Sequence, residues 1–449
     1  MAHFTFHGGI ELRGRKERTQ NLPIREVLPG RYLVFPMMNE EKPLVFPGEY
    51  VLAGQILARA EGTSGSRIHS SVSGIVKSVE KRMTSRGKAY DSIIIENDDK
   101  YKEIDFGEFA EADEMENRQI LTRIMNAGIP DRFSGGMVYP KLDIKEPQKI
   151  RHIIVNCTEC EPYLTVRNRL SVERPEWIVE GLRVLLKLFP NAKGILAVEN
   201  DQQEAITALQ KILADSRNMK LIPVKRKYPQ DTERMLIYAC TGKAINFSKS
   251  AEDARCIVLD SDTVYAICNA VSFGKPVCKR LVTLSGECFK QPKNIEVFLG
   301  TLMSELAVKE GELSELPDQV ICGGPMTGTL IEQKKDCPDG VRLSGLLEET
   351  LNLPVTKEIS AILCLKKSHR RKSSGMCIGC GYCVDVCNEQ LLPVRLAKAA
   401  AAGGKEQFIK LGGMECCECG SCSYICPAER DLSEKIKKMK QQIISEKES

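Results

Sequence analysis

Two cysteine-rich segments near the C-terminal end constrain the fold of this chain more than any other feature. Each has the spacing C-x2-C-x2-C-x3-C: Cys377, Cys380, Cys383 and Cys387, then Cys416, Cys419, Cys422 and Cys426. Three thiolates at this interval wrap one face of an iron–sulfur cube, and in two-cluster ferredoxins the fourth ligates the other cluster. The spacing therefore predicts two [4Fe–4S] clusters with crossed ligation. Cys426 completes the first set of three, and Cys387 completes the second.

Zinc ligation and disulfide bonding fit these cysteines less well. Structural zinc usually takes its ligands as two separated pairs, whereas here four cysteines lie in one short run, twice. Disulfides belong to secreted proteins, and we find no signal peptide in the sequence. Eleven further cysteines are scattered, mostly in apolar stretches, where they are expected to be small buried hydrophobic residues. So many unpaired thiols indicate a reducing cytoplasm.

Length and charge limit the remaining classes of function. The chain has 449 residues, enough for about three domains. Its net charge of +4 is small for this length, and no helix-turn-helix pattern is present, so we expect no nucleic-acid partner. No apolar run approaches the ~18 residues that a membrane-spanning helix needs. Any membrane association is therefore expected to be peripheral, through a partner.

The first part of the chain, residues 1–110, has the pattern of a β domain. Short apolar runs alternate with prolines and glycines. Two segments, 47–58 and 68–79, resemble the two halves of the barrel-sandwich hybrid of lipoyl and biotinyl carriers. The lysine that those carriers modify is missing, which favours a docking or scaffolding module over a carrier.

Strand and helix patterns alternate through residues 111–275 and predict a parallel sheet flanked by helices. Neither a G-x-G-x-x-G nor a Walker A motif occurs. Two features are candidates for ligand binding: the loop at Gly135 and Gly136, and the polar segment from Asn156 to Tyr163 that follows a buried strand. Cys157 and Cys160 in this segment resemble half of a metal site, but no second half is evident.

Three smaller segments complete the chain. Residues 276–355 predict alternating strands with a short helix, and residues 365–430 contain the cysteine motifs. A basic run at 365–372 is typical of a solvated linker, with docking of an acidic electron carrier as the alternative. Residues 431–449 predict a Lys-rich helix with an apolar stripe, which packs either on the protein itself or on a partner or membrane surface.

Several motifs occur together in the order found in one family. The chain is similar to RnfC, the peripheral subunit of the Rnf ferredoxin:NAD oxidoreductase complex. The resemblance rests on His7-Gly-Gly-Ile, Ile68-His-Ser-Ser-Val-Ser-Gly, Glu159-Cys-Glu-Pro-Tyr, Tyr228-Pro-Gln, Gly274-Lys-Pro, Val320-Ile-Cys-Gly-Gly-Pro-Met-Thr-Gly, Pro354-Val-Thr-Lys and the cysteine motifs. It implies a barrel-sandwich hybrid, an α/β flavin/NADH-type domain, a soluble-ligand-binding β-grasp module and a two-[4Fe–4S] ferredoxin-like domain.

The family function implies FMN and NAD(H) as further cofactors. It also implies partners among the other subunits of a membrane electron-transport complex, together with a ferredoxin or flavoprotein, at the cytoplasmic face of the membrane. The residues that match the family's flavin and nucleotide site are Gly135, Gly136, Lys141, Asn156, Glu159 and Glu161.

Departures from the family pattern concentrate at this same site. The family loop runs approximately Ala-Gly-Ile-Val-Gly-x-Gly-Gly-Ala-Gly-Phe-Pro-Thr-x-x-Lys-Leu, whereas residues 127–142 place Arg132, Phe133 and Met137 where the family has small residues. These side chains would crowd a flavin. Three further positions differ: Arg167-Asn168 replaces an acidic residue, Asp231 follows Tyr228-Pro-Gln in place of glycine, and Asp260 stands where asparagine is expected.

The sequence leaves two hypotheses open. In the first, the chain is an RnfC-type subunit that passes electrons between NAD(H), flavin and two clusters. In the second, it is an RnfC-like relay and docking protein that carries electrons between protein partners without binding NADH. A pure iron–sulfur sensor has only the cysteine motifs in its favour.

Overall fold

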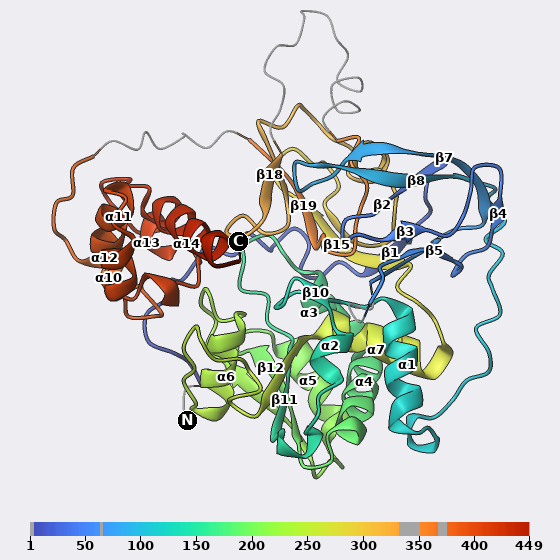
Figure 1. The fold of residues 1–449 in the computed structure, drawn as a ribbon, viewed down its shortest axis with the longest axis horizontal. Coiled ribbons are helices and arrows are strands. Elements are labelled where there is room, and N and C mark those ends of the chain that lie inside the picture. The colour runs from blue at the N-terminus through green and yellow to red at the C-terminus, as the bar shows by residue number, and fades with distance from the viewer. Residues whose placement is uncertain (1–3, 63–65, 332–350, 367–374, 449) are drawn as a thin grey trace, which may run out of the picture.

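The computed structural model describes residues 4–62, 66–331, 351–366 and 375–448. Within these ranges four modules follow one another along the chain (Figure 1). Residues 367–372 of the basic run lie outside the described residues. The described chain contains no helix that is long and apolar enough to cross a membrane.

The N-terminal module is a barrel-sandwich hybrid of two small sheets. One sheet has the order β2-β8-β7-β4 and the other β3-β5-β6. Alternating apolar residues such as Leu33, Leu57 and Ile93 point between the sheets and are completely buried. The strands are β2 (Tyr32–Pro36), β3 (Lys42–Pro43), β4 (Tyr50–Val51), β5 (Ile56–Arg59), β6 (Arg67–His69), β7 (Gly74–Met83) and β8 (Ala89–Asn97).

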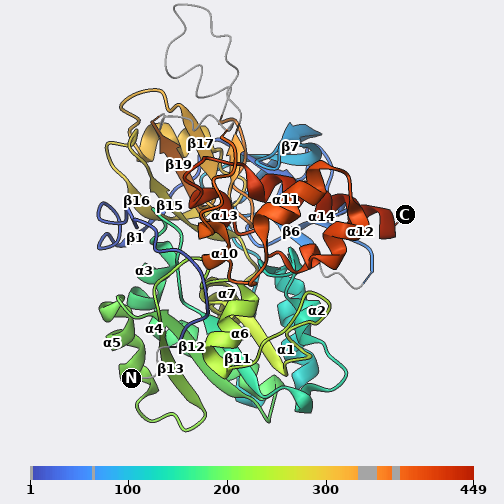
Figure 2. The same ribbon diagram turned by 90° about the vertical axis from the view of Figure 1, so that its left-hand side faces the viewer.

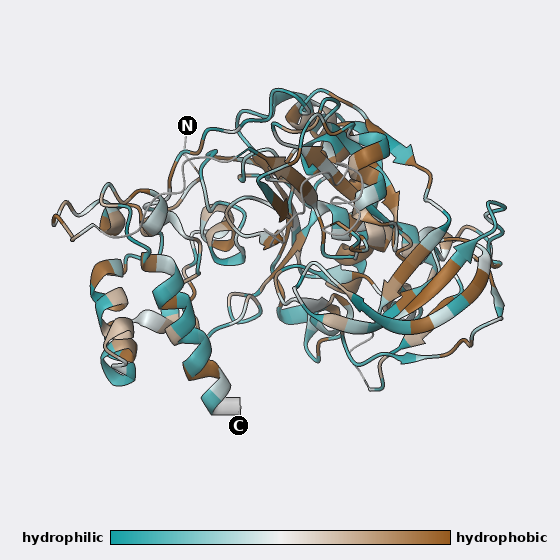
Figure 3. Cartoon of the chain, turned by 90° about the horizontal axis from the view of Figure 1, so that it is seen from above, coloured by the Kyte–Doolittle hydropathy of each residue, from teal (hydrophilic) through white to brown (hydrophobic). Residues whose placement is uncertain are grey.

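The second module is an α/β domain with a parallel sheet in the order β13-β12-β11-β14. Its strands are almost continuously apolar because helices cover both faces, and they are brown in the centre of Figure 3. The strands are β11 (His152–Asn156), β12 (Lys193–Glu199), β13 (Met219–Val224) and β14 (Cys256–Asp260). The helices are α1 (Asn117–Ala127), α2 (Tyr139–Leu142), α3 (Val166–Glu173), α4 (Pro175–Leu188), α5 (Gln203–Leu213), α6 (Glu233–Thr241) and α7 (Ser261–Phe273).

Between α1 and α2 lies a short hairpin of β9 (Pro130–Asp131) and β10 (Gly136–Met137). Gly128 ends α1 in the left-handed conformation, at φ 61°, which turns the chain toward this hairpin. The hairpin therefore reaches the carboxyl end of the parallel sheet, where ligands bind in open α/β folds.

The third module is a mixed sheet in the order β1-β16-β15-β19-β17-β18. It recruits β1 (Ile24–Val27) from the start of the chain, which pairs in parallel with β16. The other strands are β15 (Lys279–Ser285), β16 (Lys293–Phe298), β17 (Gln319–Cys322), β18 (Thr329–Ile331) and β19 (Ala361–Leu365), with the short helix α8 (Met303–Glu305). The first residues of the chain thus tie the second and third modules together, since Phe4 also bridges to Val224.

The cysteine motifs lie in a small helical module, red in Figure 2. It consists of α10 (Tyr382–Asp385), α11 (Pro393–Ala401), α12 (Lys405–Lys410), α13 (Ser421–Tyr424) and α14 (Leu432–Glu448). The apolar stripe of α14, formed by Leu432, Ile436, Met439 and Ile443, is at most 5% exposed and packs against α11 and Phe408. Of the two placements left open for this stripe, the structure shows packing on the protein itself.

Candidate functional site

The first set of cysteines surrounds a cavity of about 450 Å³. Cys377, Cys380 and Cys383 come from one end of the module, and Cys426 comes from the end of the second motif. Gly379 and Gly381 have φ of 72° and 83°, values that favour glycine and let the backbone wrap around the cavity. The structure thus brings the predicted crossed set together around a space.

The second set lines a narrower cavity. Cys416, Cys419 and Cys422 share it with Cys387 of the first motif, again as the crossed ligation requires. Backbone N–H groups donate to two of these sulfurs, from Leu391 to Cys387 at 3.3 Å and from Glu418 to Cys416 at 3.4 Å. Such donors stabilise cluster-bound thiolates.

Both cysteine sets are grouped as the predicted crossed ligation requires. In each set the four side chains line one cavity. Cys417 also lines the second cavity but is hydrogen-bonded to Asn388, and it falls outside the C-x2-C spacing. The spacing of the eight thiols and their grouping into two crossed sets match the ligands of two [4Fe–4S] clusters.

The two sets differ in their exposure. Cys377 and Cys380 are exposed, and the neighbouring Met376 and Ile378 are 89% and 69% exposed. The second set faces the α/β domain instead, because the buried Tyr228 donates its hydroxyl hydrogen to the carbonyl of Cys419 at 2.6 Å. One set therefore lies at the surface and the other at a domain interface.

Further contacts hold this interface together. The most important of them, made by Arg234, was not predicted from the sequence. Arg234 of α6 donates to Glu389 and Glu415, each at 3.2 Å, and to the carbonyl of Glu415 at 2.9 Å. The N–H of Gly9 donates to the carbonyl of Val386 at 2.9 Å. A lone arginine on a helix carries no sequence signal for this role, since its partners follow more than 150 residues later.

The second candidate site lies at the carboxyl ends of β11 and β14. Asn156 ends β11 and Asp260 ends β14, and both side chains are buried. The amide of Asn156 donates to Asp260 at 2.7 Å, and its oxygen accepts from the N–H of Thr158 at 3.0 Å. Asn156 is therefore committed to contacts within the protein.

The two predicted glutamates are equally committed. Glu159 accepts the backbone N–H groups of Arg167 and Asn168 at 3.2 and 3.3 Å, at the start of α3. Glu161 accepts the N–H of Met326 at 2.7 Å and the hydroxyl of Thr327, which ties it to the third module. Burial, together with the charge of Asp231, raises the pKa of Glu161. Glu161 thus links two modules, whereas Glu159 holds the start of α3 within its own module.

The remaining predicted residues belong to the hairpin and α2. Lys141 pairs with Glu233 at 2.8 Å and with Asp131 at 3.3 Å. Gly135 and Gly136 lie at the exposed tip of the hairpin. Cys157 and Cys160 do not form a metal half-site with each other: Cys160 donates to Asp231 at 2.8 Å, while Cys157 lies beside Ser171.

The hairpin contacts the carboxyl end of β14 through Arg132. Arg132 donates to Asp260 at 2.7 Å and pairs with Asp231 at 3.3 Å, and Arg167 donates to Asp260 at 3.1 Å. Burial alone would raise the pKa of Asp260, but the guanidinium groups of Arg132 and Arg167 hold this pKa well below its usual value. The end of β14 thus holds an ionised carboxylate between two arginines.

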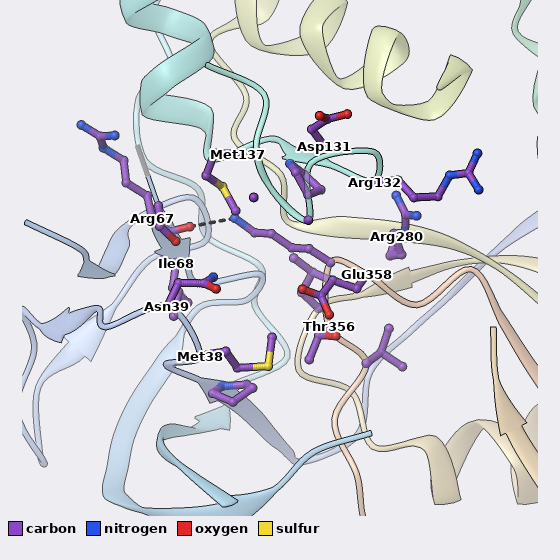
Figure 4. Close-up of a pocket in the computed structure, with 18 of the residues that line it drawn as sticks. Met38, Asn39, Arg67, Ile68, Asp131, Arg132, Met137, Arg280, Thr356 and Glu358 are labelled. Carbon is purple, nitrogen blue, oxygen red and sulfur yellow. Dashed lines mark hydrogen bonds between the residues drawn. The ribbon is translucent and has the colours of Figure 1, made fainter. Parts of the chain in front are cut away.

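A cavity of about 340 Å³ lies at the hairpin, where the barrel-sandwich module, the α/β domain and the third module meet (Figure 4). Gly135, Gly136, Arg167 and Asp260 are among the residues that line it. Arg67, Ile68 and Met38 line one side, and Arg132 and Met137 line another. Lys357 also lines it and donates to the carbonyl of Arg67 at 2.7 Å. Lys141, Asn156, Glu159 and Glu161 are not among the residues that line this cavity.

Known proteins resemble the chain along its whole length. The C subunit of the Na(+)-translocating ferredoxin:NAD(+) oxidoreductase complex of Acetobacterium woodii is 32% identical over 457 residues, covering 100% of this chain and 99% of that protein. This chain belongs to the RnfC family. The C subunit of the proton-translocating ferredoxin:NAD(+) oxidoreductase complex of Clostridium ljungdahlii is 30% identical, covering 88% of this chain and 84% of that protein.

Three family models match separate parts of this RnfC chain. They describe the RnfC barrel sandwich hybrid domain at residues 4–100, the Nuo51 FMN-binding domain at 124–269 and a 4Fe-4S dicluster domain at 376–429. An NAD+-reducing [NiFe]-hydrogenase in the H2-reduced state has a similar fold, with a TM-score of 0.50 at 16% identity over 74% of this chain and 63% of that one. The family and fold class predicted from the sequence are confirmed.

Proposed function

We propose that this protein is the C subunit of an Rnf-type, ion-translocating oxidoreductase complex. In this role it is an electron-transfer subunit that links the NAD(H) and flavin chemistry of the complex to two [4Fe–4S] clusters. The full-length similarity to proteins of two ferredoxin:NAD(+) oxidoreductase complexes supports the assignment. When bound, each cluster supplies one-electron transfer, which hydride chemistry by itself does not provide.

The arrangement of the two cysteine sets is the single observation that carries this proposal. Tyr228 and Arg234 hold the inner set, with Cys419, against the α/β domain, while Cys377 and Cys380 face outward. The backbone N–H groups of Leu391 and Glu418 donate to Cys387 and Cys416 of the inner set, where they would stabilise cluster-bound thiolates. The module therefore connects the α/β domain with the protein surface.

The outward set gives the expected partners a place to contact the chain. Arg395, Lys398 and Arg430 line the cavity of this set, which suits an acidic redox partner such as a ferredoxin or flavoprotein. The other subunits of the complex would hold the chain at the cytoplasmic face of the membrane as a peripheral subunit.

Anaerobic isolation from membranes through a tag on this chain tests the proposal. We expect integral membrane subunits to be isolated with it, and dithionite to produce the EPR signals of two reduced clusters. The matched control is a tagged chain with Arg234→Met, which should keep its clusters but hold the helical module less firmly. A wild-type chain that is isolated alone, or without clusters, would contradict the proposal.

A further inference from the structure

Four departures from the family pattern meet at one point in the structure. Arg132, Arg167, Asp231 and Asp260 come from four different segments spread over more than 120 residues. Arg132 contacts both aspartates, and Arg167 contacts Asp260. The departures therefore form one ion-pair network at the carboxyl ends of β11 and β14.

The charges of this network balance. Two arginines face two aspartates, and Arg167 and Asp260 are only 9% and 3% exposed. A charge buried this deeply without a partner is strongly destabilising. The four charged side chains therefore stabilise one another in the folded chain.

Phe133 fills the space beside the network. Its ring centre lies 4.8 Å from the guanidinium carbon of Arg132 and 5.1 Å from the amine of Lys141. The ring also packs against the apolar cluster that includes Ile154 and Ile237 under the sheet. The chain thus places its own aromatic ring where the family loop has bare backbone.

The cationic side chains that would bind a flavin phosphate are already paired with carboxylates. Lys141 is paired with Glu233 and Asp131, and both guanidinium groups are paired with carboxylates. An anionic phosphate placed there would have to displace those carboxylates and face Asp260. The paired charges of this network therefore do not fit the phosphate of FMN.

We infer that this chain holds no flavin of its own, because Arg132 and Arg167 are already paired with carboxylates and the network places the carboxylate of Asp260 in the wall of the cavity. Its clusters then exchange electrons with one-electron carriers on partner proteins, each cluster gaining or losing one electron as the carrier loses or gains one. This inference rests on the proposed function and specifies it, since the flavin that meets NAD(H) lies on another chain.

The first experiment uses the full-length wild-type chain, purified anaerobically with reconstituted clusters. We expect less than about one FMN per ten chains after acid extraction, and no quenching of FMN fluorescence in a titration to about 100 μM, well above typical cofactor affinities. NADH should leave the cluster absorbance unchanged, while dithionite bleaches it. A wild-type chain that binds FMN at about one per chain overturns the inference.

The second experiment removes the ion pair and the aromatic ring at the hairpin. The triple variant Arg132→Gly, Phe133→Gly and Asp260→Asn removes one charge of each sign together with the aromatic ring, so the net charge is unchanged. We expect it to quench FMN fluorescence with at least about tenfold higher affinity than wild type. The matched control is Arg174→Met with Glu296→Gln, which removes a partly buried ion pair outside this network and should gain no affinity.

The outcomes separate this inference from the proposed function. A triple variant that keeps its clusters and still rejects FMN would show that the network is not what excludes flavin, and would overturn the inference. If the triple variant does not fold, the FMN titration and the NADH test on the wild-type chain still decide whether this chain holds flavin. A wild-type chain with two reducible clusters and bound FMN would refute this inference but not the proposed function. A wild-type chain without clusters would refute the proposed function.

Discussion

Polar groups have opposite roles in the ferredoxin-like module and at the strand ends of the α/β domain. Around the cysteines, backbone N–H groups of Leu391 and Glu418 are directed at sulfur, and glycines keep the surrounding space open. In the α/β domain, Asn156, Lys141 and Asp260 are bonded to other side chains of the protein. A site that receives a cofactor leaves donors directed at it, whereas the polar groups at the strand ends are satisfied within the protein.

The largest effect is expected from the cysteines. Serine at Cys426 should remove the same cluster as serine at Cys377, because both belong to the first crossed set, and iron should fall by about half. Iron analysis and EPR of the remaining cluster measure this, and Cys417→Ser is the control that should keep its iron. If Cys426→Ser instead matches Cys416→Ser, ligation is not crossed.

The next effect concerns the stability of the ion-pair network at these strand ends. Arg132→Gly leaves Asp260 and Asp231 short of a cation, and should lower the free energy of unfolding by about 2 kcal/mol, since Arg132 is 41% exposed and the cost of a fully buried pair must be reduced. Adding Asp260→Asn should recover part of this loss, because it removes a carboxylate that has lost one of its cations but leaves Arg167 with the carboxylate of Asp262, which is farther away at 3.9 Å. Urea denaturation followed by circular dichroism tests the cycle, and additive losses would mean that the two residues are not coupled.

A pH effect is expected from Glu199, at the carboxyl end of β12. Burial raises its pKa to about 7, and its Oε1 has no hydrogen-bond partner among the described residues. The folded protein therefore prefers the protonated form. The contribution of this group to stability is fully present below about pH 4.5 and is lost as the pH rises to 7, by about 1–3 kcal/mol.

Glu199→Gln should remove most of this dependence, so that the variant is more stable than wild type at pH 8 and similar at pH 4.5. Thermal unfolding at both pH values measures the difference. Glu204→Gln, at a side chain that is 69% exposed, is the control and should retain the wild-type pH dependence. An unchanged pH profile in Glu199→Gln would assign the dependence to another group.

The smallest effect is expected at the contact between the two regions. Tyr228→Phe removes the hydrogen bond to the carbonyl of Cys419 and should cost about 1 kcal/mol. Iron content should stay at the wild-type level, because the hydroxyl contacts backbone and no thiol. Loss of iron in this variant would show that Tyr228 supports the inner cysteine set directly.

Local sequence was enough to predict the cysteine sets, the alternating strands and helices, and the family. Cluster ligands follow a fixed short spacing, and the periodicity of buried strands and helices is also local. The sequence also marked Arg132, Arg167, Asp231 and Asp260 as departures, but not that they touch. Their pairing depends on the parallel sheet bringing the ends of β11 and β14 together beneath the hairpin.

Tertiary structure alone decided the roles of the other site residues. Glu159 and Glu161 looked like ligand-binding residues in sequence, yet they accept hydrogen bonds from α3 and from the third module. Tyr228 and Arg234 set which cysteine set faces inward, through partners more than 150 residues away. The partners of a side chain are fixed by long-range packing. The sequence therefore determined which reactive side chains this chain carries, and only the fold determined which of them are paired within the protein.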